Sequence, residues 1–306
     1  MSLIGMVTLR QLRYFESLAE ARHFGHAAEA CAVSQPALSM QIKELEDELG
    51  VSLVERRKSG IALTDQGREV ADRARAILAS VRDLLDYARH RDEVLSGSLK
   101  LGAIPSIAPY LLPEVLPELQ CRFPKLNLQL RETLTENLVN ELLAGELDLI
   151  LIALPIEDPE IETLHLFDDK FILATKATQE NKKSKHATAT MLAEGRLLLL
   201  EEGHCLRDQA LSFCRLVTPE TRNSFGASSL ATIVQMVANG YGVTLLPEMA
   251  IGSETHHHGD IRLLRFNGVE PKREIGFAWR KTSPRKADFL KFAELLREVV
   301  PRADVV

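Results

Sequence analysis

Two cysteines in one short segment are the residues of this chain whose type and spacing could support redox chemistry. The segment, residues 203–214, reads GHCLRDQALSFC, and its Cys205 and Cys214 lie nine positions apart. One apolar face recurs at helical spacing, at Leu206, Ala210 and Phe213. Nine residues of α-helix rise about 13.5 Å, whereas a disulfide needs its Cα atoms within roughly 7 Å. While the segment stays helical, these two thiols cannot bond to each other.

The polar neighbours of Cys205 favour a reactive thiol. A position near a helix N-terminus, beside His204 and Arg207, favours the thiolate, which is the nucleophilic form of cysteine. Reduction of a peroxide also needs a proton for the departing hydroxide. His204, Arg207 and Asp208 are the nearby candidates to donate or orient that proton. The alternative is a pair of core cysteines with no redox role.

Composition limits the kind of protein. The chain has 306 residues, of which 45% are hydrophobic and 26% are charged, as expected for about two globular domains. No apolar run approaches the roughly 18 residues of a membrane span, and the N-terminus lacks signal-peptide features. We therefore expect a cytoplasmic protein, in which cysteines are more often thiols than permanent disulfides. The net charge of −6 argues against non-specific nucleic-acid binding, so DNA recognition must depend on local geometry.

Residues 27–49 have the pattern of two short helices joined by a tight turn. Ser34 is a good N-cap, Pro36 is tolerated in a first helical turn, and Gly50 can end the helix. The second helix carries an apolar stripe at Leu38, Ile42, Leu45 and Leu49. This pattern matches a helix-turn-helix, whose second helix can enter a major groove. The candidates for DNA contact are Ser34, Gln35, Pro36, Ala37, Ser39, Met40 and Lys43.

Residues 54–63 read as a small hairpin with basic residues and a glycine near its tip. This is the shape of a wing, and its basic residues could bind phosphates. They are Arg56, Arg57 and Lys58.

Residues 64–92 predict one long helix, since they contain no proline and only one glycine. Apolar residues recur at spacings of 4, 3, 4, 3 and 4, at Val70, Ala74, Ile77, Val81, Leu84 and Ala88. Such a heptad seam most simply pairs with a second copy of the chain. The alternative is one amphipathic helix that packs on its own domain.

From Leu99 onward, strands and helices alternate. We expect strands at 99–104, 126–131, 147–153, 171–174, 196–200, 243–246 and 275–279. We expect helices at 107–123, 135–144, 205–214, 229–238 and 284–300. Repeated βαβ units predict an α/β fold with a doubly wound sheet, whose ligands bind at the carboxyl ends of the strands.

Two sets of motifs resemble a known family. The run HFGHAAEACAVSQPALSMQIKELEDELGVSLVER at 23–56, followed by LTDQG at 63–67, resembles the winged helix-turn-helix of LysR-type bacterial transcriptional regulators. Within that family, three segments resemble the peroxide-sensing members: IPSIAPYLLP at 104–113, EEGHCLRDQALSFC at 201–214 and GVTLLP at 242–247. The resemblance covers nearly the whole chain.

The resemblance implies a domain organisation. Residues 1–63 would form an all-α winged helix-turn-helix domain, and residues 64–94 a linker and dimerisation helix. Residues 95–306 would form a redox-sensing α/β regulatory domain, like a periplasmic binding protein, with two subdomains of doubly wound sheet. Subdomain I would take about 98–168 and 275–306, and subdomain II about 169–274.

The resemblance also implies a function. Hydrogen peroxide would oxidise Cys205 to a sulfenic acid that condenses with Cys214, and the helix between them would have to unwind first. Ser106, where family members commonly have threonine, would hold peroxide together with the Thr135 hydroxyl. Arg273 would complete the pocket.

The implied partners are promoter DNA, further copies of the chain, hydrogen peroxide and RNA polymerase. The chain would form a homodimer and then a homotetramer, and a glutaredoxin- or thioredoxin-like dithiol reductant would reset it. We expect no cofactor, no metal site and no enzymatic activity. Cys31 and Cys121 are expected to be structural, and the triple histidine at 256–258 to lie in an exposed loop.

Two other functions stay open. In the first, a LysR-type regulator binds a small organic effector and its cysteines are incidental. In the second, the chain is a thiol peroxidase, which leaves the helix-turn-helix unexplained.

Overall fold

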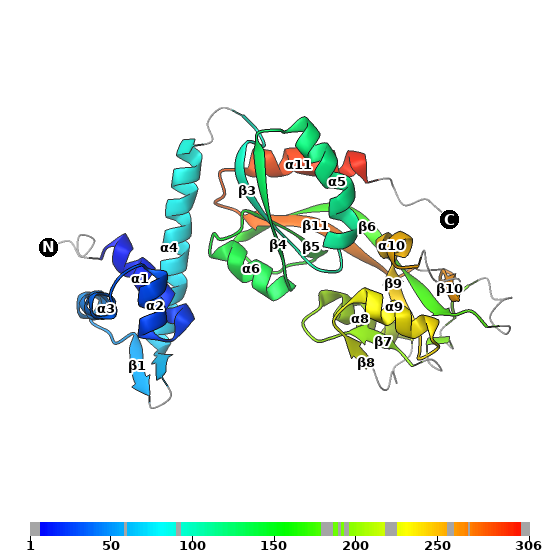
Figure 1. The fold of residues 1–306 in the computed structure, drawn as a ribbon, viewed down its shortest axis with the longest axis horizontal. Coiled ribbons are helices and arrows are strands. Elements are labelled where there is room, and N and C mark those ends of the chain that lie inside the picture. The colour runs from blue at the N-terminus through cyan, green and yellow to red at the C-terminus, as the bar shows by residue number, and fades with distance from the viewer. Residues whose placement is uncertain are drawn as a thin grey trace. The chain divides into compact units, whose positions relative to one another are not determined.

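The computed structural model describes residues 7–57, 60–89, 93–178, 186–188, 191–192, 196–217, 225–255, 260–268 and 270–300. Within these ranges, the side chains of residues 56–57, 60, 86, 88–89, 214–217 and 225 are not described. The chain divides into two compact units, one of residues 1–89 with 143–146 and one of the remaining residues (Figure 1). Among the described residues, no helix is both long and apolar enough to cross a membrane.

The N-terminal unit contains the predicted helix-turn-helix. Helix α1 (Leu9–Ala21) precedes the pair α2 (Phe24–Ala30) and α3 (Gln35–Leu49). The Ser34 hydroxyl caps α3 by accepting a hydrogen bond from the Ala37 amide at 3.4 Å. The core of this unit includes Leu38, Ile42 and Leu45. Leu49, predicted to lie in the same stripe, is 39% exposed because α3 ends at that residue.

The predicted wing is an antiparallel hairpin of β1 (Val54–Arg57) and β2 (Gly60–Leu63). Its base is fixed to α3, because a Glu46 carboxylate oxygen accepts from the amides of Leu53 at 2.6 Å and Val54 at 3.2 Å. A Cβ added at Gly67 would lie 2.0 Å from the Leu53 carbonyl oxygen. Only glycine therefore lets the next helix approach the wing so closely.

The long helix α4 (Asp65–Arg89) packs beside α1 in its first half (Figure 1). Ala71 and Ala74 are buried in the core of the unit. Ile77 and Leu84, farther along the heptad seam, are 46% and 65% exposed. The first half of the helix thus packs on its own domain, and pairing of the second half with another copy stays a prediction.

One seven-stranded sheet organises the C-terminal unit. Its strands are β3 (Gly97–Ala103), β4 (Leu126–Glu132), β5 (Leu149–Leu154), β6 (Ile161–Lys176), β9 (Thr244–Pro247), β10 (Ile261–Leu264) and β11 (Lys272–Arg280). The order is β10-β6-β11-β5-β3-β4, and β9 also pairs with β6. Among the described strands of this sheet, only the pairings of β3 with β4 and with β5 are parallel. The α/β class is confirmed, but the sheet is mixed because β6 and β11 are long antiparallel partners.

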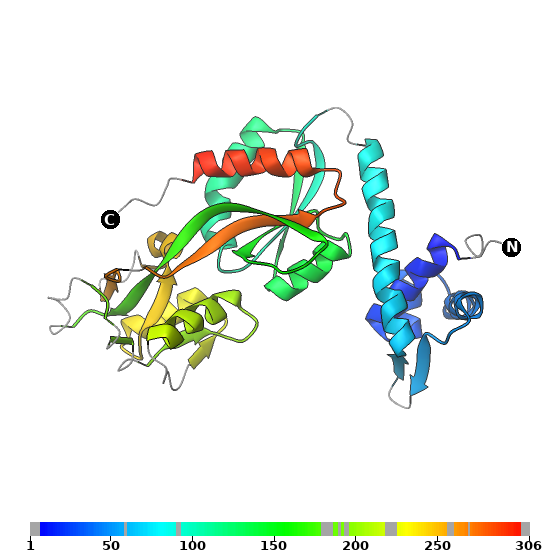
Figure 2. The same cartoon turned by 180° about the vertical axis from the view of Figure 1, so that it is seen from behind.

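The helices of this unit lie close to the predicted ranges: α5 (Ala108–Arg122), α6 (Thr135–Leu143), α8 (Cys205–Val217), α9 (Leu230–Ala238) and α11 (Lys286–Val299). Short elements β7 (Leu198–Leu200), β8 (Phe225–Ala227), η3 (Glu248–Ala250) and α10 (Ile251–Thr255) complete the unit. Helix α11 lies along α5 and contacts β6 (Figure 2). The sequence patterns missed β8, β10 and the first half of β6. The predicted loop at 178–190 lies largely outside the described residues.

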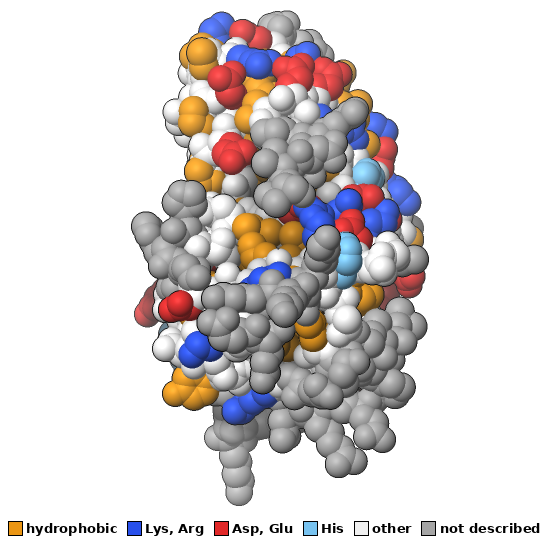
Figure 3. Space-filling view, turned by 90° about the vertical axis from the view of Figure 1, so that its right-hand side faces the viewer, with side chains coloured by type: hydrophobic (Ala, Val, Ile, Leu, Met, Phe, Trp, Pro, Cys, Tyr) orange, Lys and Arg blue, Asp and Glu red, His pale blue; other side chains and the backbone are white. Residues whose placement is uncertain are grey.

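A separate hydrophobic core, made of residues between Phe171 and Phe266, occupies the part of the chain that we propose as subdomain II. Strands β6 and β11 pass between this part and the rest of the sheet. In Figure 3, the described Lys and Arg side chains lie among Asp and Glu at the top and right of the view and are scattered elsewhere. The described residues of that face therefore form no continuous basic surface for DNA.

Cys121 was expected to be structural, but it is not a core residue. It is exposed on α5. The buried face of α5 runs through Val115 and Leu119, and a position two residues after Leu119 is turned by about 200° around the helix.

Candidate functional site

Cys205 is the first residue of α8 and is partly buried. The turn that precedes the helix contains Gly203, whose φ of +93° lies in a region that L side chains rarely adopt. The free amides of a first helical turn are partial positive charges and stabilise an anion there. The backbone thus places the Cys205 sulfur at the N-terminal end of α8.

Eight residues from three segments close a small pocket around this sulfur: Ile104, Pro105, Ser106, Leu134, Thr135, Gly203, His204 and Cys205. The first segment follows β3, the second begins α6 and the third begins α8. The structure thus brings together four residues singled out in the sequence, Ser106, Thr135, His204 and Cys205. The walls lie so close together that this structure leaves no free space of the size of a water molecule between them, so a ligand could enter only if they moved apart.

Ser106 is a rigid part of the pocket. It is 3% exposed, and Arg273 makes two hydrogen bonds to it. Arg273 donates from Nη1 to the Ser106 hydroxyl oxygen at 2.8 Å and from Nη2 to the Ser106 carbonyl oxygen at 2.9 Å. Arg273 therefore does not line the pocket itself, although it was predicted to complete it.

The Thr135 hydroxyl lacks a hydrogen-bond partner within the described part of the chain. Its Oγ1 atom is buried, and the residue lines the pocket. A buried hydroxyl left unpaired costs about 1–3 kcal/mol. A small polar ligand bound beside Cys205 would remove that cost.

His204 lines the pocket as a neutral group. Burial lowers the pKa of its imidazole below the ordinary value, although the nearby Glu201 acts in the opposite direction. The expectation that His204 adds a positive charge beside Cys205 is therefore not met near neutral pH. A neutral imidazole can still donate a hydrogen bond from one ring nitrogen.

Two predicted neighbours do not reach the pocket. The Arg207 guanidinium donates from Nη1 to the Leu200 carbonyl oxygen at 3.1 Å and lies 3.9 Å from a Glu202 oxygen. Asp208 is exposed to solvent. Neither residue is among the pocket walls, because their positions on α8 turn them away from the loops that carry Ser106 and Thr135.

Helix α8 is continuous from Cys205 through the position of Cys214 and ends at Val217. At 1.5 Å per residue the two Cα atoms are about 13.5 Å apart along the helix. The side chain of Cys214 lies outside the described residues. Leu206 and Ala210 are buried in the core of this part, and the Phe213 ring packs edge-on against Phe266, with 5.0 Å between their centroids.

The candidate DNA-contacting residues of α3 are accessible. Gln35, Pro36, Met40 and Lys43 are exposed, and Ala37 and Ser39 are partly exposed. Ser34 is exposed as well, although its hydroxyl serves as the helix cap. Arg56 and Arg57 lie on β1, but their side chains and all of Lys58 are outside the described residues, as is the triple histidine at 256–258.

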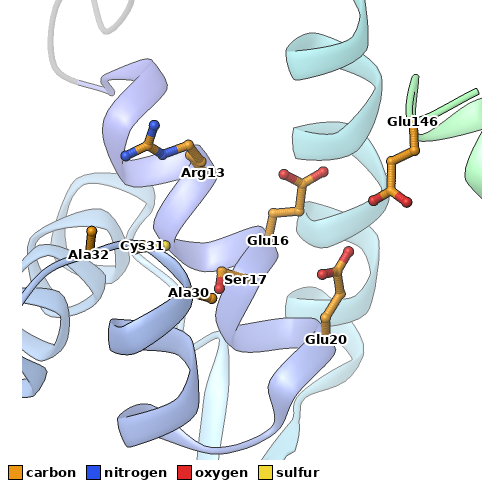
Figure 4. Close-up of a pocket in the computed structure, with 8 residues that line it drawn as sticks. All are labelled: Arg13, Glu16, Ser17, Glu20, Ala30, Cys31, Ala32 and Glu146. Carbon is orange, nitrogen blue, oxygen red and sulfur yellow. The ribbon is translucent and has the colours of Figure 1, made fainter. Parts of the chain in front are cut away.

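A second pocket lies against α1 and the end of α2 (Figure 4). Glu16 and Glu20 project from the same side of α1 toward α4, and Glu16 lies 3.6 Å from Arg82 of α4. Cys31 lines this pocket and packs at the edge of the core. Carboxylates repel phosphates, so Glu16 and Glu20 do not favour DNA at this pocket, although Arg13 also lines it. In the described part of the chain, no cluster of three or more His, Cys, Asp or Glu side chains could hold a metal ion.

Comparison with known proteins gives matches over both units. The model of the LysR substrate binding domain matches residues 92–301, and that of bacterial regulatory helix-turn-helix proteins of the lysR family matches residues 9–68. The DNA-binding transcriptional dual regulator OxyR of Escherichia coli (strain K12) is 40% identical over 291 residues, which are 95% of each chain.

Solved structures give the same relationship. A full-length OxyR variant from Pseudomonas aeruginosa is 39% identical over 95% of each chain, with a TM-score of 0.77. A peroxide-bound mutant of Corynebacterium glutamicum OxyR is 35% identical over 95% of this chain and 94% of that one, with a TM-score of 0.62.

Proposed function

The chain belongs to the LysR family of bacterial transcriptional regulators, and we propose that it senses hydrogen peroxide through Cys205. It is a DNA-binding regulator that closely resembles OxyR. The observation that carries the proposal is the pocket at the N-terminus of α8, which Cys205 lines together with Ser106 and Thr135. The hydroxyl of Thr135 is buried and has no hydrogen-bond partner among the residues that the structure describes.

The first chemical step oxidises the sulfur. The Cys205 thiolate attacks one oxygen of hydrogen peroxide, the O–O bond breaks, and sulfenic acid and hydroxide form. The hydroxide takes a proton and leaves as water. Ser106, Thr135 and neutral His204 are the groups in the pocket that can donate hydrogen bonds to the peroxide oxygens during this transfer.

The second step joins Cys205 to Cys214. The Cys214 thiol displaces the sulfenic oxygen as water, and a disulfide forms. Because α8 is continuous between the two residues, part of this helix must unwind before the sulfurs can meet. Unwinding removes the apolar face of α8 from its core, so the disulfide selects a second conformation of the segment.

The change in α8 would reach DNA through the assembly of several chains. A homodimer presents two copies of α3, and DNA reads their separation as the spacing of two half-sites. We propose that repacking of the regulatory domains alters this separation, within a homodimer or homotetramer on promoter DNA. RNA polymerase would respond to the altered complex, and a dithiol reductant would reset the disulfide.

An organic effector fits the pocket less well than peroxide does. A carboxylate effector needs a fixed cation, but Arg273 directs its guanidinium to Asp169 and Ser106. No charged side chain is among the pocket walls, since His204 is held neutral by burial.

Footprinting on promoter DNA tests the proposal with three proteins: the unmodified chain, Cys205→Ser and the control Cys121→Ser. Cys121 is an exposed thiol outside the pocket. Peroxide should change the footprint of the unmodified chain and of the control, and leave that of Cys205→Ser unchanged. A peroxide response that persists in Cys205→Ser would remove Cys205 as the sensor.

A further inference from the structure

We propose that Asp169 is a positioning residue for the reaction of Cys205 with peroxide, acting through Arg273 and Ser106. This inference rests on the proposed sensing function and adds a residue that does not touch the pocket. Asp169 lies on β6, and Arg273 is its partner in register on β11. The two strands cross here between the core that contains Phe171 and the rest of the sheet.

Asp169 and Arg273 form a buried ion pair. Their side chains are 2% and 0% exposed. Asp169 Oδ2 accepts from Arg273 Nε at 2.9 Å and lies 2.9 Å from Nη2. Its other oxygen, Oδ1, accepts from the Met249 amide at 3.1 Å. Asp169 therefore balances the charge of Arg273 and fixes the plane of its guanidinium.

The fixed guanidinium determines how the Ser106 hydroxyl is used. A guanidinium only donates hydrogen bonds, so the Ser106 oxygen must accept from Nη1 at their 2.8 Å contact. The hydroxyl proton must then point away from Arg273. Ser106 is a wall of the pocket that holds Cys205, so this proton can be donated to an oxygen of bound peroxide. Asp169 thus fixes Arg273, and Arg273 in turn fixes the direction of the Ser106 O–H bond.

Asparagine at position 169 would disrupt these hydrogen bonds, although its side chain has nearly the same size as that of aspartate. Three donors approach the two carboxylate oxygens, from Arg273 and from Met249. An amide has one oxygen and a donating NH2 group, so at least one of these donors would face another donor. Arg273 would also lose its balancing charge and could turn, which would release the Ser106 hydroxyl.

The test compares two reagents on full-length reduced protein that also carries Cys214→Ser, so that oxidation stops at the sulfenic acid. Reaction of Cys205 with hydrogen peroxide needs a proton for the leaving oxygen, whereas alkylation by iodoacetamide needs only the thiolate. Asp169→Asn should lower the peroxide rate about tenfold to hundredfold, the effect of losing one oriented donor to a developing anion. Asp169→Asn should leave the rate with iodoacetamide within about twofold of that of the parent protein, because this reaction depends on the thiolate alone.

Asp168→Asn is the matched control. Asp168 is the neighbouring residue on β6, is partly exposed and pairs with Lys272 at 2.6 Å, so both rates should stay unchanged. Circular dichroism checks that each variant folds. If Asp169→Asn does not fold, Asp169→Glu keeps the charge but displaces the carboxylate, and only its peroxide rate should fall.

Two results would overturn the inference: an unchanged peroxide rate in a folded Asp169 variant, or an equal loss with both reagents, which would mean a purely structural role. Failure of the proposed function looks different. In that case Cys205 of the protein with native Asp169 would not be oxidised by peroxide at all.

Discussion

The packing of Phe213 offers a quantitative test of whether α8 unwinds on oxidation. The Phe213 ring contacts Phe266 edge-on, with centroids 5.0 Å apart and planes at 73°. It is partly buried against the core that also holds Leu206 and Ala210. If the disulfide forces this end of α8 to leave its place, only the reduced protein has these contacts. Phe213→Ala should then destabilise the reduced state alone.

The size of the effect follows from the burial. Removing a fully buried phenylalanine costs about 3–5 kcal/mol, and an aromatic pair adds about 0.5–1.5 kcal/mol. Because Phe213 is only partly buried, we expect about 2 kcal/mol in total. For a two-electron couple, about 1.4 kcal/mol corresponds to about 30 mV. The reduction potential of the disulfide should therefore become more negative by about 40 mV.

The potential is measured by equilibrating the full-length protein in dithiol and disulfide buffers and quantifying the oxidised fraction by mass spectrometry. Val237→Ala is the control, since Val237 is buried in the same core but lies on α9. It should lower the stability of both redox states and leave the potential unchanged. An unchanged potential in a folded Phe213→Ala protein would mean that this end of α8 keeps its packing in the disulfide form.

Three further predictions concern the pocket and its support. Gly203→Ala should slow oxidation of Cys205 by peroxide, since φ is +93° there and the added Cβ would lie 3.0 Å from Leu134; an unchanged stopped-flow rate would contradict this. Asp288→Ala should lower the free energy of unfolding by about 2–3 kcal/mol, because it removes the nearer carboxylate from buried Arg285, leaving Asp148 at 3.8 Å, and takes the acceptor from the Leu95 amide; a loss below about 1 kcal/mol in urea unfolding would contradict burial of the pair. Burial lowers the pKa of His204 in the folded state, so below about pH 6.5 the unfolded chain binds a proton at this residue more readily than the folded chain does. The contribution of His204 to the free energy of unfolding is therefore fully present above about pH 6.5 and is lost as the pH falls. Thermal unfolding should thus show a smaller loss between pH 7.5 and 5.5 for His204→Gln than for the unmodified chain, and equal losses would contradict a buried neutral imidazole.

Local sequence patterns were sufficient for most of the elements. The N-cap at Ser34 and the apolar spacing of α3 predicted the helix-turn-helix, and the spacing of Leu206 and Ala210 predicted α8. These features depend on residues within one or two turns of each other, so a single sequence records them. The position of Cys205 at a helix N-terminus was predicted for the same reason.

Other features depended on how distant segments meet. Asp169 and Arg273 are 104 residues apart, and nothing local in either segment indicates the pair. The orientation of Arg207 toward Leu200 depends on the rotation of α8 against its core, which spacing alone does not specify. The antiparallel pairing of β6 with β11 made the sheet mixed, although the alternation of elements had predicted repeated βαβ units.

By itself, the amino-acid sequence determined the helices, the wing and the two thiols that a continuous helix keeps apart, because hydrogen bonds and apolar periodicity within a helix or hairpin are local. The tertiary structure decided which side chains surround Cys205 and which only support them. The reason is that burial and contacts between distant segments set the energetic cost of leaving a charge or a hydroxyl without a partner.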